Sequence, residues 1–296
     1  MIRVAAVDLG TNSTRLLVAD VDDGHVVDEV LRRSVVTGLG QGVDARRRLL
    51  PLPIARVRNV LTDFRRDAER LGAERVLAVA TSAVRDAENG EAFLGEVEWS
   101  YGFATRLLTG DEEAALTRHG AGVTGERTLL LDVGGGSTEL STGRFRTSLD
   151  VGTVRLGERF LHGDPPTPDQ LAAAAAHLAA LLPDLDAADA VGVAGTVHQL
   201  ADLAERIDVP AREVERWLET LAALPLQERR SLARLDPARA PTIVAGALIV
   251  HTVLRRYRLP AITYSVRDIL DGAAVEAAAL PAPVEGDAPP GAHTCC

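Results

Sequence analysis

The chain has 296 residues, of which 46% are hydrophobic and 25% charged, and its formal net charge is −10. This length exceeds what one hydrophobic core normally holds and predicts two domains of roughly 100–150 residues each. The composition is typical of a soluble globular protein, and the acidic balance argues against nucleic acid or a membrane as a partner.

The elements of the first half alternate between strand and helix. Apolar runs indicate the strands, and apolar residues at helical spacing indicate the helices. We expect strands at 4–7, 16–21, 25–31, 75–80 and 105–108, a glycine-rich loop at 38–42, and helices at 53–71, at 87–97 and from 109 onward.

The second half shows the same alternation. Alternating strands and helices in both halves predict an α/β fold with two similar lobes. We expect a strand at 129–133, an arginine-bearing strand pair extending to 152, strands at 190–193 and 261–266, and helices at 168–182, 195–204, 211–221, 226–234, 241–257 and 267–280.

A short sequence occurs in both halves. Residues 8–14 and residues 132–138 both read Asp-apolar-Gly-x-x-Ser-Thr, and each copy follows an apolar run. Strand, glycine turn and strand predict a hairpin whose tip carries a carboxylate, hydroxyls and accessible backbone N–H groups. Such a tip suits a metal-bound phosphate, because glycine allows close approach and N–H groups in a turn bind anions. Two such tips suggest two related halves facing one polyanionic ligand.

The chain contains no lysine, so all 32 basic residues are arginines. Walker-type phosphate loops and Schiff-base chemistry are therefore excluded, since both need a lysine amine. A phosphate ligand has to be met by arginine, backbone N–H groups, helix N-termini or a metal ion.

The only cysteines, Cys295 and Cys296, end a segment rich in proline and glycine that begins at Pro281. A disulfide framework or a cysteine-based metal site in the body of the fold is therefore excluded. We expect 281–296 to be a disordered tail; lipidation of the terminal cysteines is the alternative, but no polybasic segment precedes them. With no signal pattern, because Asp8 interrupts the first apolar run, we expect a cytoplasmic protein.

Four segments occur in a characteristic order. They read DLGTNS at 8–13, ATSAVRDAEN at 80–89, TGDEEA at 109–114 and DVGGGSTE at 132–139. Together they resemble the exopolyphosphatase/guanosine pentaphosphate phosphatase family, which belongs to the actin-like, sugar-kinase and Hsp70 ATPase superfamily. The resemblance extends over about residues 1–280 and matches the short, two-domain members of the family.

The resemblance implies a fold of two ribonuclease-H-like lobes with the active site in the cleft between them. Lobe I would comprise 1–124, with the final helix at about 267–280 packing back on it, and lobe II 125–266. It also implies Mg²⁺-dependent release of terminal phosphate, with Mn²⁺ as an alternative metal. The implied substrate is inorganic polyphosphate or, as in some members, guanosine pentaphosphate. Oligomeric state is left open, with a homodimer among the alternatives.

The resemblance places the catalytic base at Glu113. Hydrolysis of a phosphoanhydride needs an oriented water and a group that accepts its proton. The competing interpretation is structural, because Thr109-x-x-Glu112 is a capping box and acids in a first turn favour the helix dipole. That interpretation suits Glu112, whereas Glu113 points about 100° away on the same helix. We assign catalysis to Glu113 and capping to Glu112.

Asp132 and Glu139 are the candidate metal ligands, since carboxylate oxygens suit Mg²⁺, which usually keeps several waters. They lie on the two arms of one hairpin and can converge at its mouth. Asp8, the equivalent of Asp132 in the first copy, is a third candidate that would share the metal or orient water. The alternative is that these acids only cap tight turns.

Phosphate contacts are expected from the two glycine turns, from one arginine after a buried-type strand and from a strand-to-helix junction. An ion pair with a neighbouring acid is the alternative for this arginine. The candidates are Gly10, Thr11, Asn12, Ser13, Arg85, Gly134, Gly135, Gly136, Ser137, Gly195 and Thr196.

Two departures from the family pattern stand out. Where the family often has Leu-Arg-Glu-Gly, this chain has Ile-Leu-Asp-Gly at 269–272, which puts binding of very long chains in doubt unless Arg267 partly substitutes. An Arg-Ala-Asp segment becomes Arg-Ala-Pro at 239–241. The arginine runs at 46–48, 65–66 and 255–256 are interpreted as solvated faces rather than a polyphosphate track.

The sequence predicts an exopolyphosphatase that favours shorter chains. A kinase of the same superfold and a non-catalytic sensor of polyphosphate or an alarmone are the competing hypotheses. The combination of Glu113, Asp132 and Glu139 argues against the sensor.

Overall fold

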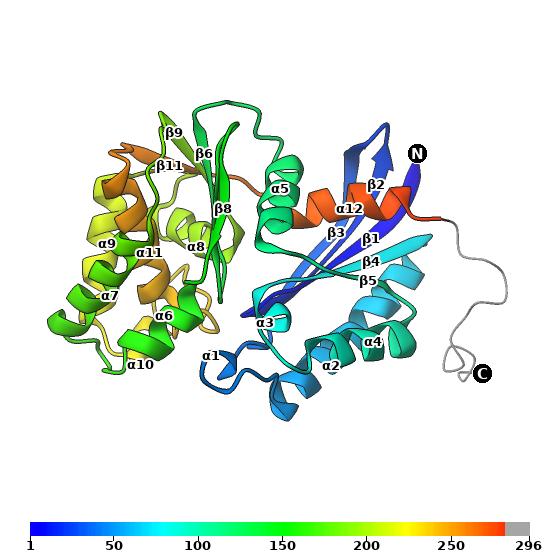
Figure 1. Ribbon diagram of the computed structural model, residues 1–296, viewed down its shortest axis with the longest axis horizontal. Coiled ribbons are helices and arrows are strands. Elements are labelled where there is room, and N and C mark those ends of the chain that lie inside the picture. The colour runs from blue at the N-terminus through cyan, green and yellow to red at the C-terminus, as the bar shows by residue number, and fades with distance from the viewer. Residues whose placement is uncertain (282–296) are drawn as a thin grey trace. The chain divides into compact units, whose positions relative to one another are not determined.

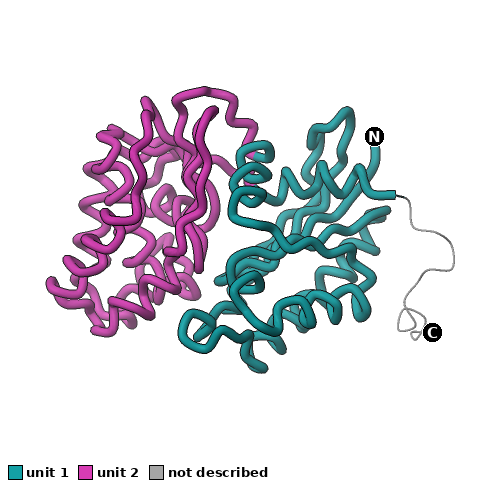
Figure 2. Tube along the Cα trace, viewed as in Figure 1, with its two compact units in different colours: residues 1–120, 269–296 teal, residues 121–268 magenta. Residues whose placement is uncertain are grey.

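The structure is a computed structural model that describes residues 1–281. The chain divides into two compact units (Figure 2). Among the described residues, unit 1 comprises Met1–Gly120 and residues 269–281, and unit 2 comprises Ala121–Asp268. The expected disordered tail at 281–296 lies, apart from its first residue, outside the described residues.

Unit 1 is built on a five-stranded mixed sheet in the order β3-β2-β1-β4-β5. The first three strands are antiparallel neighbours, whereas β4 runs parallel to β1, and β5 to β4. The strands are β1 (Ile2–Leu9), β2 (Ser13–Asp22), β3 (His25–Val36), β4 (Arg75–Ala80) and β5 (Ala104–Leu107).

Helices cover both faces of this sheet (Figure 1). Alternate residues of β1 point to opposite faces, so Ala5 and Val7 pack against α2 and α4, while Val4 and Ala6 pack against α12. The helices are α1 (Val43–Arg46), α2 (Pro51–Arg70), α3 (Ser82–Arg85), α4 (Gly90–Tyr101), α5 (Gly110–Gly120) and α12 (Ile269–Ala279). By the same alternation, Asp8 lies on the face of α5 and α12.

Unit 2 repeats this arrangement. Its sheet has the order β10-β11-β9-β6-β7-β8, in which five strands correspond to those of unit 1 and β10 is added antiparallel at the edge. The strands are β6 (Thr128–Val133), β7 (Thr138–Ser141), β8 (Arg146–Leu149), β9 (Asp189–Val193), β10 (Asp208–Pro210) and β11 (Ala261–Tyr264). Two such sheets confirm the predicted α/β class with two ribonuclease-H-like lobes.

One hydrophobic core in unit 2 joins Leu129, Leu131 and Val133 of β6 to the helices. The alternate residues Leu130 and Asp132 point to the opposite face of the strand. The helices are α6 (Thr153–Phe160), α7 (Pro168–Leu181), α8 (Ala194–Ala204), α9 (Ala211–Ala223), α10 (Leu226–Arg229) and α11 (Ile243–Arg256).

Several expected boundaries are wrong. The helix expected at 226–234 ends at Arg229, and the last two helices begin at Ile243 and Ile269 rather than at 241 and 267. Helix α6 is absent from the prediction because its first turn is held by backbone hydrogen bonds to a distant hairpin. Within residues 1–281, no helix combines the length and apolarity that a membrane span requires.

Candidate active site

The two copies of the repeated sequence form equivalent hairpins that differ at one pair of residues. In the β1–β2 ladder Asp8 lies directly opposite Arg15, and in the β6–β7 ladder Asp132 lies directly opposite Glu139. Residues directly opposite each other point to the same face of a sheet. The first hairpin therefore carries a carboxylate beside an arginine, and the second carries two carboxylates.

The tip of each hairpin is closed by the same contact. The amide of Gly10 donates to the carbonyl of Ser13 at 3.1 Å, and the amide of Gly134 donates to that of Ser137 at 3.1 Å. Glycine is required next to the second tip, because a Cβ at Gly152 would collide with the backbone of Gly135. Both tips thus keep the tight backbone geometry that the sequence predicts.

A segment that follows the third strand holds each tip in place. In unit 1 the amide of Gly40 donates to Thr11 O at 2.8 Å, and in unit 2 the amide of Val154 donates to Gly135 O at 2.8 Å. The candidate phosphate-binding turns are therefore fixed by backbone hydrogen bonds from outside the hairpins. Because these hydrogen bonds already order the turns, their N–H groups could bind a ligand without a further entropic cost.

In unit 1, Asp8 is 5% exposed and pairs with Arg15. The Arg15 Nη2–Asp8 Oδ2 distance is 2.7 Å, and Arg15 Nε donates to the same oxygen at 2.9 Å. A partly buried, hydrogen-bonded pair of this kind fixes both side chains. Asp8 remains a candidate metal ligand, but its Oδ2 is already paired with the Arg15 guanidinium.

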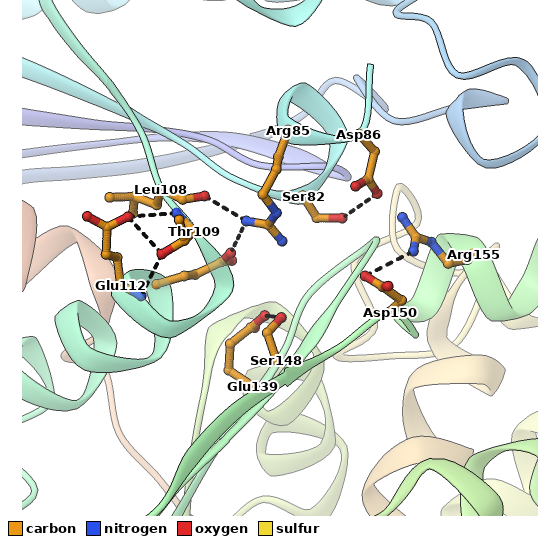
Figure 3. A network of polar contacts seen from close by, with 11 residues as sticks. Ser82, Arg85, Asp86, Leu108, Thr109, Glu112, Glu139, Ser148, Asp150 and Arg155 are labelled. Atoms are coloured by element: carbon orange, nitrogen blue, oxygen red, sulfur yellow. Dashed lines mark hydrogen bonds and ion pairs between the residues drawn. The ribbon is translucent and has the colours of Figure 1, made fainter. Parts of the chain in front are cut away.

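Glu113 and Arg85 lie together in the same unit. Glu113 is 6% exposed on α5 and accepts a hydrogen bond from Arg85 Nη1 on Oε2 at 3.1 Å. The same Nη1 donates to the carbonyl of Leu108 at 2.8 Å (Figure 3). The candidate base and the candidate phosphate clamp are thus neighbours, and the guanidinium is anchored to the backbone beside the carboxylate.

Glu112 forms the predicted capping box. Its carboxylate accepts hydrogen bonds from the amide and hydroxyl of Thr109, both at 2.8 Å, and Glu112 N donates to the Thr109 hydroxyl at 3.3 Å (Figure 3). Arg106 Nη2 donates to its other oxygen at 2.8 Å. The Thr109 amide, together with Arg106, lowers the pKa of Glu112 from 4.5 to about 2. Glu112 therefore orients the start of the helix that carries Glu113.

We predict that Glu112→Gln destabilises the protein by about 1 kcal/mol or less near neutral pH, because the capping carboxylate is partly exposed. A carboxylate with a lowered folded-state pKa adds stability above its unfolded value, and this stability disappears as the pH falls. The difference between parent and variant should be complete above pH 4.5 and vanish toward pH 2. Urea unfolding across this range measures it; a difference that stays constant with pH would contradict the prediction.

In unit 2, Asp132 and Glu139 are 6% and 3% exposed. Glu139 Oε1 accepts a hydrogen bond from the hydroxyl of Ser148 at 2.6 Å (Figure 3), and Ser148 lies opposite Glu139 in the β7–β8 ladder. Three neighbouring strands therefore present Asp132, Glu139 and Ser148 in one row. The serine orients one oxygen of the glutamate, a supporting contact that is typical of metal-ligating carboxylates.

The acid pair of unit 2 suits a hard divalent cation. Two buried carboxylates on facing strands supply oxygen ligands, and Mg²⁺ completes its octahedron with water and substrate oxygens. Within residues 1–281, no group of three or more His, Cys, Asp or Glu side chains forms a complete metal site. The donor set therefore fits Mg²⁺ with a mostly aqueous or phosphate shell rather than a closed structural site.

The Gly195–Thr196 junction lies beside the second hairpin. The Thr196 hydroxyl donates to the carbonyl of Val133 at 3.2 Å, which connects the first turn of α8 to the strand that carries Asp132. The guanidinium of Arg239 lies against Gly195, where a Cβ would overlap its Nη1. The expected helix N-terminus is thus in place, with a largely buried arginine next to it.

Three side chains at these hairpins are not among the candidates that the sequence predicts: Ser148, Arg155 and Arg239. Arg155 follows two residues whose amides donate to the turn carbonyls of Gly134 and Gly135, and its own amide donates to Gly135 O at 3.2 Å. Its side chain is 8% exposed and approaches Asp150 at 3.5 Å. The position of Ser148 beside Glu139 depends on the register of β8 against β7, which the local sequence does not encode.

Of the departures from the family pattern, the one at 269–272 is explained by packing. Leu270, where the family often has arginine, is 1% exposed in the core between β1 and α12. The next residue, Asp271, pairs with Arg32 Nη2 at 2.9 Å. Arg267, the suggested substitute, is exposed in unit 2. We find no structural account of the lost acid at Pro241.

The fold and the residues described above define a class of protein. Each of the two ribonuclease-H-like sheets carries a buried aspartate beside a glycine turn, and unit 1 also has a buried glutamate next to an arginine. Carboxylates and guanidinium groups are the kinds of group that hydrolysis of a phosphoanhydride uses. A family model described as the Ppx/GppA phosphatase family matches residues 17–278, and the chain belongs to this family. It is accordingly a hydrolase that acts on phosphoanhydride bonds.

Sequence relatives and solved structures match nearly the whole length of this chain. Exopolyphosphatase 2 of Mycobacterium tuberculosis is 38% identical over 314 residues, covering 93% of this chain and 98% of the relative. The crystal structure of an exopolyphosphatase-like protein has a TM-score of 0.85 at 29% identity, covering 93% of this chain and 97% of the other. The Aquifex aeolicus Ppx-GppA enzyme has a TM-score of 0.75 at 29% identity, with coverage of 93% and 99%.

Proposed function

We propose that this protein is an exopolyphosphatase that releases terminal phosphate from inorganic polyphosphate and depends on Mg²⁺. The observation that carries the proposal is the pair of buried acids, Asp132 and Glu139, facing each other on a hairpin with a glycine tip. The similarity to exopolyphosphatase 2 of Mycobacterium tuberculosis supports polyphosphate as the substrate class.

Glu113 is the proposed general base. A water molecule attacks the terminal phosphorus, its proton passes to the Glu113 carboxylate, and the bond to the bridging oxygen breaks. The products are inorganic phosphate and a chain one phosphate shorter, which leaves with the bridging oxygen. Burial of Glu113 at 6% exposure limits competing hydrogen bonds from bulk water.

Arg85 has a proposed dual role. Its guanidinium neutralises charge on the transferring phosphoryl group, and its hydrogen bond to Glu113 Oε2 fixes the orientation of the base. The anchor to the Leu108 carbonyl holds the guanidinium in position before substrate binds, so little reorganisation is needed during reaction.

Asp132 and Glu139 are the residues that would hold Mg²⁺, and Asp8 is proposed as a further ligand or as a residue that orients water. A bound divalent cation supplies positive charge to the phosphoryl oxygens. The glycine turns, Gly10 to Ser13 and Gly134 to Ser137, would position those oxygens through their N–H groups. The buried Leu270 at an often arginine position supports a preference for shorter chains.

We predict that the purified protein with Mg²⁺ releases phosphate from polyphosphate and that chelation of the metal abolishes the release. Polyphosphates of graded length and guanosine pentaphosphate should be compared in parallel. Faster turnover of guanosine pentaphosphate would replace polyphosphate as the substrate. Binding without turnover of either compound would favour a sensor, and phosphoryl transfer from ATP to an acceptor without phosphate release would favour a kinase.

A further inference from the structure

Unit 1 carries an arginine cluster that differs from the other basic runs of the chain. In the run 65–66, Arg65 Nε lies 2.7 Å from Glu69 and Arg66 Nη1 lies 3.5 Å from Asp63. In the run 255–256, Arg256 Nη2 lies 2.5 Å from Asp184. Arg65, Arg66 and Arg256 are therefore each compensated by a nearby carboxylate.

The run Arg46, Arg47 and Arg48 has no such partners. All three side chains are exposed, and none forms an ion pair with any acid among residues 1–281. Asp44 is the only acid in the segment 38–48. In a protein of net charge −10, an uncompensated cluster of this kind is a local positive potential that attracts polyanions.

Arg56 extends the cluster toward the first hairpin. Its Nη2 donates to the neutral Gln41 side chain at 3.1 Å, and its guanidinium lies 3.2 Å from where a Cβ at Gly38 would be. The amide of Gly38 in turn donates to Asn12 O at 2.9 Å. The half-buried Arg56 charge therefore lies next to the loop that holds the turn at 10–13.

The backbone that carries the cluster is held at both ends. Gly40 is bonded to Thr11, and at the other end Leu49 N donates to the Asn89 side chain at 2.8 Å. The carbonyl of Arg47 accepts from Glu88 N at 2.8 Å, and Val43 and Leu49 are buried in the core. The arginine side chains are therefore presented from an ordered segment, which lowers the entropic cost of binding.

We propose that Arg46, Arg47, Arg48 and Arg56 form a binding site for the part of a polyphosphate chain that is not being hydrolysed. The site rests on the proposed function, since the turn at 10–13 would bind the reacting end. The spacing of charges along a flexible polyanion allows several exposed guanidinium groups to be engaged at once. This assignment replaces the interpretation of run 46–48 as a solvated face and retains that interpretation for the other two runs.

The test compares Arg46→Gln/Arg47→Gln/Arg48→Gln with a matched control, Arg65→Gln/Arg66→Gln. Each exposed contact is expected to contribute about 1.5- to fivefold in affinity, so the triple variant should bind long polyphosphate about tenfold more weakly. Binding is measured by fluorescence anisotropy of labelled long polyphosphate in EDTA, where no turnover occurs. The slope of log affinity against log salt should decrease by about two to three in the triple variant. The control should stay within about twofold of the parent.

Steady-state kinetics give the second readout. The ratio of KM for long polyphosphate to KM for tripolyphosphate should rise about tenfold in the triple variant, because a long chain offers the cluster many more phosphates than a short one does. Arg56→Gln should shift the ratio in the same direction. Equal weakening by both multiple variants, or an unchanged salt slope, would overturn the site. If the parent releases no phosphate from any polyphosphate, the proposed function is wrong. The binding comparison in EDTA still tests whether the arginine cluster binds polyphosphate.

Discussion

Replacing Glu113 with glutamine is expected to lower kcat for phosphate release by about 10²- to 10⁴-fold, the contribution typical of a positioned general base. Glutamine keeps the shape of the side chain but cannot accept the proton of the attacking water. The ion pair with Arg85, whose Nη1 lies 3.1 Å from Glu113 Oε2, is lost in the same change. Single-turnover phosphate release measures the chemical step, and equilibrium binding checks that substrate still binds.

Glu112→Gln is the matched control for this experiment. It removes the neighbouring acid on the same helix, which caps the helix through Thr109, and should change kcat by less than about twofold. If Glu113→Gln hydrolyses as fast as the parent, the assignment of the base is wrong. A large loss of kcat in Glu112→Gln alone would show that the roles of the two glutamates are exchanged.

Removing either acid of the second hairpin should strongly weaken divalent metal binding. We expect Glu139→Gln or Asp132→Asn to weaken Mn²⁺ binding, measured by electron paramagnetic resonance, by a factor on the order of 100 or more, since even supporting residues contribute about 10- to 100-fold. Hydrolysis should be lost in parallel. The physical reason is that each substitution removes one of two negatively charged ligands from a site that is nearly buried.

Ser148→Ala provides a graded comparison. It leaves both acids in place but removes the 2.6 Å hydrogen bond to Glu139, so Mn²⁺ affinity should fall about tenfold and excess metal should restore activity. Glu126→Gln, which neutralises an exposed acid paired with Arg144 in the same unit, should have no effect. Unchanged Mn²⁺ affinity in Glu139→Gln would contradict the metal assignment.

The two hairpins differ in charge and are therefore expected to bind a metal ion unequally. The register places Arg15 and Glu139 at corresponding positions, opposite Asp8 and Asp132. An arginine 2.7 Å from Asp8 Oδ2 reduces the negative charge offered to a cation, whereas a second carboxylate increases it. We therefore expect Asp8→Asn to weaken Mn²⁺ binding less than Asp132→Asn does.

Local signals in the sequence were sufficient for much of this protein. The alternation of apolar runs and helical patterns predicted the two α/β halves, and the repeated turn predicted both hairpins, since glycine and the strand pattern act over a few residues. The capping box at Thr109 and Glu112 was also predictable, because its hydrogen bonds join residues three apart.

Tertiary structure decided the features that depend on residues far apart in the chain. The pairing of Arg85 with Glu113, the support of Glu139 by Ser148 and the burial of Leu270 each require strands or helices that the sequence does not place side by side. Helix α6 is not predicted by the sequence either, because its first amides donate to carbonyls of the distant second hairpin. Arg65 and Arg66 have acid partners within four residues on the same helix, whereas Arg256 is paired with Asp184, 72 residues away. Composition and spacing thus determine which groups are available and which of them pair within one helix, and long-range packing determines the remaining pairs.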